Sequence, residues 1–96
     1  MANYRVSPAA ERDLENIVDH TLRYWGIDQV ERYLDVRFSA FERLARSPRT
    51  APACNDLKAG YRRLRVQRHV IYFRITDYGV AIIRVLHDRM DPRRHL

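Results

Sequence analysis

Two β-strands and the turn between them are predicted by HVIYFRITDYGVAIIRVLH, residues 69–87 of this 96-residue chain. Branched and aromatic side chains dominate both halves of the stretch and suit a pleated sheet. Residues 77–79 divide the halves, and Gly79 can supply the positive φ that a tight hairpin turn needs. Residues 61–66 are predicted to form a strand before this hairpin, and residues 3–6 a short strand at the start of the chain.

The segment between the first two strands has helical periodicity. Ser7 is placed to cap a first helix, Asp13 to complement its dipole, and Gly26 to end it. Asp28 and Glu31 have the spacing of a capping box, which predicts the start of a second helix. Each helix has one apolar stripe, formed by Leu14, Ile17, Val18, Leu22 and Trp25 and then by Val30, Tyr33, Leu34, Phe38, Phe41 and Leu44. So short a turn between two helices predicts an antiparallel helix hairpin.

The predicted fold class is therefore α+β, with the helix hairpin packed on a small, mainly antiparallel sheet in the order β-α-α-β-β-β. Length predicts a single domain covering residues 1–96. Strand alternation predicts that the second face of the sheet is apolar with arginines set into it, and this face would present Val70, Tyr72, Arg74, Val80, Ile82, Arg84 and Leu86. Two helices can cover only one face, so we expect a bound partner on the other. The alternative is that the chain itself covers both faces.

Composition restricts the class of protein. Hydrophobic residues make up 46% of the chain and charged residues 31%, which is typical of a globular domain. There is no apolar run long enough to span a membrane and no signal-peptide pattern at the N-terminus, so we expect a cytoplasmic protein with no membrane association. A single cysteine, Cys54, agrees with a reducing compartment.

Positive charge is concentrated in the second half of the chain. Residues 1–57 carry eight Arg and nine Asp or Glu, whereas residues 58–96 carry ten Lys or Arg and three Asp. Such a field favours polyanions or acidic protein partners, although a basic edge that only faces water is the alternative. His69 and His87, on neighbouring strands, could serve as an acid–base pair. No metal site or cofactor motif is present in the sequence, and we predict neither.

Several segments, in order, resemble the ParE toxins of the RelE/ParE superfamily. The opening residues 4–10, the inter-helix turn at residues 24–26 and the end of the second helix at residues 43–48 are similar to that family. Residues 57–63 and 69–74 resemble its central strands. The closing residues 83–91, with Arg94-His95-Leu96, form the most specific match. The resemblance covers nearly the whole chain.

The resemblance implies a toxin of a type II toxin–antitoxin system. ParE-type proteins inhibit DNA gyrase and are neutralised by a ParD-like antitoxin, so the chain would form a hetero-oligomer and meet operator DNA only through the antitoxin. RelE-type relatives share the fold but cut messenger RNA on the ribosome, usually with a C-terminal tyrosine. This chain has no tyrosine after Tyr78, which counts against ribonuclease activity. A degenerate, non-toxic co-repressor that only binds the antitoxin is a third hypothesis.

These inferences assign roles to residues. We expect no catalytic residues, and therefore not an enzyme; a ribonuclease would use His69, His87, Arg89 and His95. Contact with the target is expected from the basic edge and tail, at His87, Arg89, Met90, Arg93, Arg94 and His95. Contact with the antitoxin is expected from the helix hairpin and the second sheet face, at Trp25, Tyr33, Tyr72, Arg74, Ile82 and Arg84.

Overall fold

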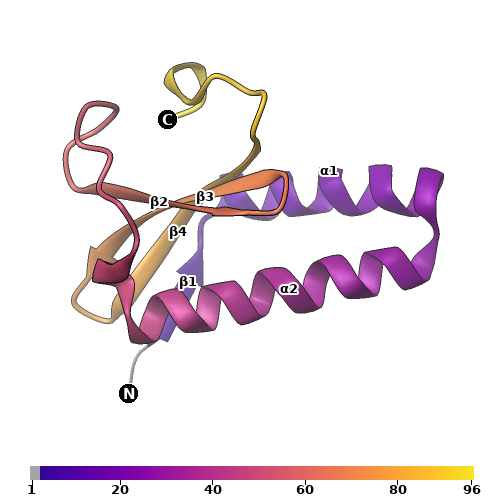
Figure 1. Cartoon of the computed structure of the whole chain (residues 1–96), viewed down its shortest axis with the longest axis horizontal. Coiled ribbons are helices and arrows are strands. Elements are labelled where there is room, and N and C mark those ends of the chain that lie inside the picture. The colour runs from indigo at the N-terminus through magenta and orange to yellow at the C-terminus, as the bar shows by residue number, and fades with distance from the viewer. Residues whose placement is uncertain (1–2) are drawn as a thin grey trace.

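Residues 3–96, which the computed structural model describes, form two long helices and a four-stranded sheet in the predicted order (Figure 1). The elements are β1 (Asn3–Val6), α1 (Pro8–Trp25), α2 (Ile27–Arg46), β2 (Tyr61–Val66), β3 (His69–Thr76) and β4 (Gly79–His87). Two short 3₁₀ turns, Pro48–Thr50 and Pro92–Arg94, lie in the long loop and in the C-terminal tail. Within the described residues, neither long helix has a stretch apolar enough to cross a membrane.

The sheet is mixed, with the spatial order β1-β4-β3-β2. The strands β2, β3 and β4 pair antiparallel, and β1 pairs parallel to β4, from Asn3 opposite Gly79 to Val6 opposite Ile82. Gly79 has φ +139°, and a Cβ atom there would collide with the carbonyl group of Asn3. Glycine therefore allows β1 to lie close against the start of β4.

The hairpin of α1 and α2 covers one face of the sheet, and its closed end projects beyond the strands (Figure 1). The main core lies between these layers and contains fully buried Phe41, Ile71, Phe73, Val80 and Ile82. Their burial follows from the predicted stripe of the second helix and from one face of each central strand. The predicted α+β architecture is confirmed.

The two helices meet at a single glycine. Ser7 caps α1 as predicted, since its side-chain oxygen accepts a hydrogen bond from the Ala10 amide at 3.0 Å. Gly26, with φ +86°, ends α1 and also precedes the first residue of α2. The predicted capping box of Asp28 and Glu31 is wrong, because α2 begins at Ile27 and has no side-chain cap. Asp28 instead lies inside the first turn, where its charge complements the helix dipole.

A β-bulge in β4 changes which side chains share a face. Tyr72 pairs with Arg84, but the next residue, Phe73, pairs with Ile82, so Ile83 is an extra residue on β4. The bulge turns Ile82 toward the helices, where it is fully buried. The prediction that Ile82 lies on the same face as Arg84 and is open to a partner is wrong for this reason.

The second face of the sheet is largely covered by the chain itself. Tyr72 and Leu86 form a second cluster with Cys54, against which Leu57 from the long loop and Leu96 from the tail pack. Tyr72 is only 4% exposed. The expected open apolar face is therefore wrong at this position, and the alternative of self-coverage holds. The loop and tail supply the layer that two helices could not.

Asp13 in α1 completes the edge of β4 where β1 ends. Its two carboxylate oxygens accept hydrogen bonds from Nε and Nη2 of Arg84, both at 2.8 Å. One of these oxygens also accepts from the Val85 amide at 3.0 Å. Two residues before Val85 on β4, the carbonyl of bulge residue Ile83 accepts a hydrogen bond from the Ser7 hydroxyl at 2.7 Å. The side chains of Ser7 and Asp13 thus satisfy backbone groups of β4 beyond the end of β1, where no strand pairs with them.

We predict that Asp13→Ala destabilises the folded chain by about 3 kcal/mol, because it leaves a half-buried guanidinium and a backbone amide without their acceptor. The measurement is urea unfolding at neutral pH. Glu15→Ala, which removes an exposed carboxylate from the same helix, is the control and should change stability by less than about 0.5 kcal/mol. Equal effects of the two substitutions would refute the role given to Asp13.

Candidate partner-binding groove

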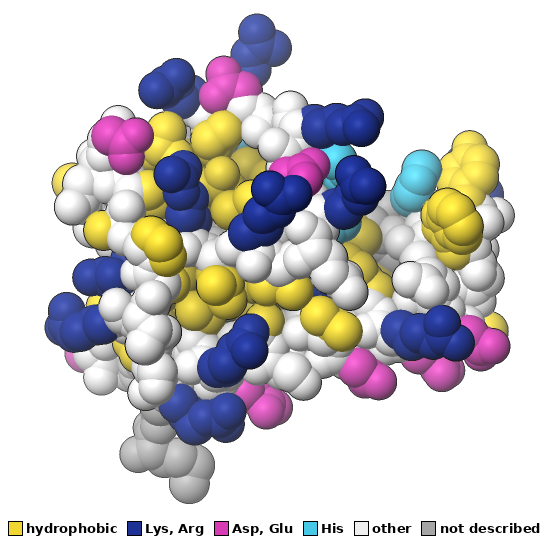
Figure 2. All heavy atoms as spheres, viewed as in Figure 1, with side chains coloured by type: hydrophobic (Ala, Val, Ile, Leu, Met, Phe, Trp, Pro, Cys, Tyr) yellow, Lys and Arg dark blue, Asp and Glu magenta, His cyan; other side chains and the backbone are white. Residues whose placement is uncertain are grey.

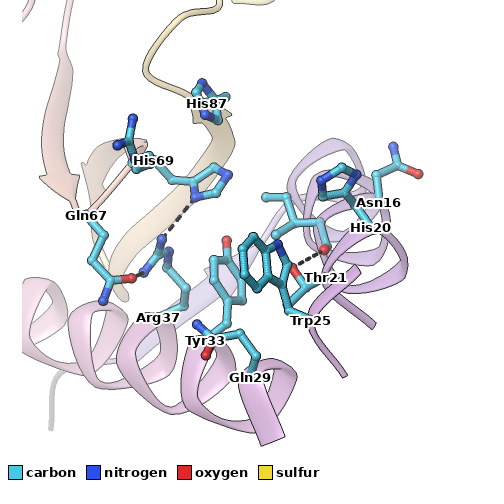
Figure 3. Close-up of a pocket in the computed structure, with 12 residues that line it drawn as sticks. Asn16, His20, Thr21, Trp25, Gln29, Tyr33, Arg37, Gln67, His69 and His87 are labelled. Carbon is cyan, nitrogen blue, oxygen red and sulfur yellow. Dashed lines mark hydrogen bonds between the residues drawn. The ribbon is translucent and has the colours of Figure 1, made fainter. Parts of the chain in front are cut away.

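An open groove of about 710 Å³ lies between the projecting half of the helix hairpin and the end of the β3–β4 pair (Figure 3). It is visible as a hollow beside the hairpin end in the space-filling view (Figure 2). Helices supply one wall, and the start of β3 and the end of β4 supply the other. The lining residues are Asn16, Ile17, His20, Thr21, Trp25, Gln29, Tyr33, Arg37, Gln67, Arg68, His69 and His87.

The closed end of the hairpin exposes aromatic and apolar side chains, and one of them, Trp25, also lines the groove. Trp25 is 72% exposed and Tyr24 65% exposed, and Leu22 and Ile27 beside them are also largely exposed. Together, these four residues at the closed end of the hairpin form what we call the hairpin-end patch. Large apolar side chains gathered on the surface of a small domain are typical of contact sites for other proteins.

The inner wall of the groove contains a buried arginine. Arg37 of α2 is 1% exposed. Its guanidinium donates to the Gln67 side-chain oxygen at 3.3 Å and to Nδ1 of His69 at 3.0 Å. It also stacks 4.1 Å from the centre of the Tyr33 ring. The side chain is therefore held in place, but only by neutral groups.

His69 is held in its neutral form. Arginine can only donate, so the 3.0 Å contact with Arg37 requires an unprotonated Nδ1. Burial, followed by the charge of Arg37, lowers the pKa of His69 from 6.5 to about 4. The His87 ring meets it edge-on, with ring centres 5.4 Å apart. The two histidines are adjacent as predicted, but His69 is tied to the wall of the groove.

Two hydrogen-bond donors of the groove have no acceptor among residues 3–96. They are Nε of Arg37 and the hydroxyl of Tyr33. Both residues are more than nine-tenths buried, and they lie four positions apart on the same face of α2. Within the described chain, no carboxylate lies within 4.0 Å of the Arg37 guanidinium. Burial also raises the pKa of Tyr33, so its hydroxyl keeps its proton.

Most of the residues predicted to contact the target are exposed on the C-terminal tail. Arg89, Met90, Arg93 and Arg94 are exposed, and they follow β4 on the segment that curls above the sheet in Figure 1. The backbone carbonyl of His95 accepts a hydrogen bond from Arg84 at 2.9 Å. The tail is thus anchored at its end while its arginines face outward. Residues 3–96 include no group of His, Cys, Asp or Glu side chains suited to a metal ion.

The six residues predicted to contact an antitoxin do not form one surface. Trp25 and Tyr33 line the groove. Arg74 is exposed on the sheet face away from the helices, and Tyr72 and Ile82 are buried. Arg84 pairs with Asp13 of the same chain, so its guanidinium already has a carboxylate partner.

Sequence reasoning missed Arg37, the central residue of the groove. Its position gives a signal, since it lies four residues after Tyr33 and four before Phe41, within the apolar stripe of the second helix. A charged residue at a position that faces the core is rare without a partner. The role of Asp13 was also missed, because its carboxylate acts on β4 rather than on its own helix.

The chain is similar to known proteins along nearly its whole length. A model of the ParE toxin of type II toxin–antitoxin systems, parDE, matches residues 4–92. Toxin ParE1 of Mycobacterium tuberculosis is 43% identical over 96 residues, covering 99% of this chain and 98% of the relative. Toxin ParE1 of Caulobacter vibrioides is 36% identical over 96 residues, covering 100% and 99%. A solved chain described as "Chromosomal ParDE TA system from P. aeruginosa" shares the fold, with a TM-score of 0.77 at 18% identity, covering 91% of this chain and 96% of that one.

The fold and the groove define a small basic α+β domain whose helix hairpin leaves an open groove beside a mixed sheet. Family and relatives make the assignment specific. The chain belongs to the ParE toxin family of type II toxin–antitoxin systems. The resemblance noted in the sequence is thereby confirmed over nearly the whole chain.

The lowered pKa of His69 predicts a pH-dependent stability. Between pH 6.5 and about 4 the unfolded chain binds a proton at this position that the folded chain does not, so the free energy of unfolding falls as the pH falls. We expect His69→Gln, which keeps an acceptor for Arg37 but does not titrate, to reduce this fall by roughly 1–3 kcal/mol. Urea unfolding of both proteins at pH 7 and pH 4.5 measures the difference. Parallel pH profiles would contradict the assignment.

Proposed function

We propose that this chain is a toxin that inhibits DNA gyrase by binding, without catalysis, and that a ParD-like antitoxin neutralises it. The observation that carries the proposal is the match to the ParE family over residues 4–92, together with relatives named toxins along their full length. The hetero-oligomer with an antitoxin is supported by the structural neighbour, whose description names a ParDE system.

The groove and the hairpin-end patch are the surfaces that we assign to the antitoxin. Exposed Trp25 and the apolar wall at Ile17 suit the apolar side of an amphipathic segment. None of the groove-lining residues is acidic, which suits a partner segment that carries negative charge. Arg74 lies on the far face of the sheet, so an antitoxin that also meets this residue must wrap around the sheet.

The tail is the surface that we assign to the target. Arg89, Arg93 and Arg94 are exposed cations that form no ion pair among residues 3–96. They lie away from the hairpin-end patch, and the anchored carbonyl of His95 fixes their position. A large acidic surface, such as that of a DNA-bound enzyme, would be attracted to this end of the chain.

The geometry of the histidines favours inhibition by binding over cleavage of RNA. His69 accepts from Arg37 with the nitrogen that a general base would use, and its lowered pKa makes it a weak base. His95, another residue of the predicted catalytic set, lies on the C-terminal tail. The runner-up, a ribosome-dependent ribonuclease, therefore has one of its four expected residues committed elsewhere.

We expect the purified chain to inhibit supercoiling by DNA gyrase at molar excess, and expression without an antitoxin to stop growth. The assay is conversion of relaxed plasmid to the supercoiled form on agarose gels. Normal supercoiling at high excess, accompanied by codon-phased cuts in translated messages on primer extension, would replace the proposal with the ribonuclease. Antitoxin binding with neither activity would indicate a degenerate co-repressor.

Charge reversal of the tail should separate the two surfaces. We expect Arg89→Glu, Arg93→Glu and Arg94→Glu together to weaken gyrase inhibition at least tenfold while antitoxin affinity changes less than threefold, because these cations lie outside the groove. Removal of residues 91–96 is a poorer test, since Leu96 covers the second cluster. The control reverses Arg43, Arg46 and Arg49, which are also exposed and give the same net charge. Equal loss in both triple variants would sink the assignment to the tail.

A further inference from the structure

We propose that the groove is a carboxylate-binding site, in which Arg37 and Tyr33 receive the acidic side chain of an Asp or Glu carried by the antitoxin. The proposed function supplies the identity of the partner. The new element is the chemistry of the anchor and the two residues that hold it. Neither residue follows from the family match, and the groups that hold Arg37 within the chain are all neutral.

Arg37 has no counter-ion among residues 3–96. A guanidinium that is 1% exposed has lost its hydration, and this loss is costly unless an anion compensates for it. Residues 3–96 offer Arg37 only an amide oxygen, an imidazole nitrogen and an aromatic face. The contrast within the same chain is Arg84, which is less buried and yet has both oxygens of Asp13.

The groove residues also carry hydrogen-bond donors without acceptors. Arg37 Nε and the Tyr33 hydroxyl both lack acceptors and belong to residues that line the groove. Both donor atoms are buried, so an entering carboxylate must displace the side chains around them, and its two oxygens then supply one acceptor for each donor. In Figure 3, both side chains extend from α2; Arg37 points toward Gln67 and His69, and Tyr33 stands between Arg37 and Trp25.

The surroundings of Arg37 favour a carboxylate over a phosphate group. A phosphate group carries more charge and three acceptor oxygens, and it is usually held by several cations or by a helix N-terminus. Here one guanidinium stacks on the Tyr33 ring, and Trp25 and the apolar side chain of Ile17 line the same groove. One carboxylate on an amphipathic protein segment meets the charge of Arg37 and the apolar wall together.

The consequence is an opposition between stability and binding. A buried charge without a counter-ion costs stability, and the two acceptors that Arg37 would leave behind, on Gln67 and His69, are neutral and belong to residues that are not fully buried. Arg37→Met should therefore leave the free toxin at least as stable as the wild type while it weakens antitoxin binding. A residue that only supports the fold would behave in the opposite way, so the two readouts together distinguish a binding role from a structural one.

The experiment combines two measurements on the full chain. In the first, sodium propionate is titrated into the ¹⁵N-labelled toxin at constant ionic strength, and the Arg37 Nε–H signal is followed by NMR. We expect a saturable shift in the wild type that Tyr33→Phe weakens. In the second, calorimetry measures affinity for the antitoxin encoded beside the toxin gene. We expect Arg37→Met to lose at least tenfold and Tyr33→Phe at least threefold, whereas Arg43→Met, an exposed control on the same helix, stays within twofold.

The outcomes separate this inference from the proposed function. Wild-type affinity in Arg37→Met, a marked loss of its stability, or a shift with inorganic phosphate but not with propionate would each overturn the carboxylate site. Failure of the wild-type toxin to bind the antitoxin, with the propionate shift intact, would refute the proposed partner and leave the carboxylate site standing.

Discussion

The position of the helix hairpin depends on one carboxylate, that of Asp13, at the open edge of β4. The strand β1 is four residues long, so the second half of β4 pairs with β3 but has no strand on its other side. Asp13 accepts from the Val85 amide and from Arg84 there, and Ser7 satisfies the carbonyl of the bulge. These bonds tie the first turns of α1 to the sheet edge, so the rest of the hairpin extends past the strands.

This overhang creates the groove beside the sheet. The half of the hairpin that extends past the sheet cannot bury its apolar stripe against strands, so Trp25 stays exposed and a hollow forms beside His69. Arg37 lies buried in the inner wall of that hollow, held by Gln67 and His69. A fully packed hairpin would be more stable but would offer no site, which is the common opposition between stability and binding surface in small domains.

The second half of the chain separates two kinds of arginine. Arg84 is partly buried and paired, and it joins α1, β4 and the tail through Asp13 and the His95 carbonyl. Arg89 and the arginines after it are exposed. The excess of positive charge in the sequence predicted a basic surface, but charge counting treats all arginines alike. Which of them pair within the chain depends on carboxylates that are distant in sequence, such as Asp13, 71 positions before Arg84.

The sequence by itself determined the element order, the α+β class, the Ser7 cap and the family, because these depend on local periodicity, capping residues and motif spacing. It also predicted partner contacts for Trp25 and Tyr33, and the structure places both side chains in the lining of the groove. Only the tertiary structure decided the β-bulge at Ile83, the burial of Tyr72 and Ile82, and the isolation of Arg37. Strand alternation assumes an unbroken register, and a single extra residue moves every later side chain to the other face. Whether a buried charge has a counter-ion depends on contacts between distant segments, which no local pattern contains.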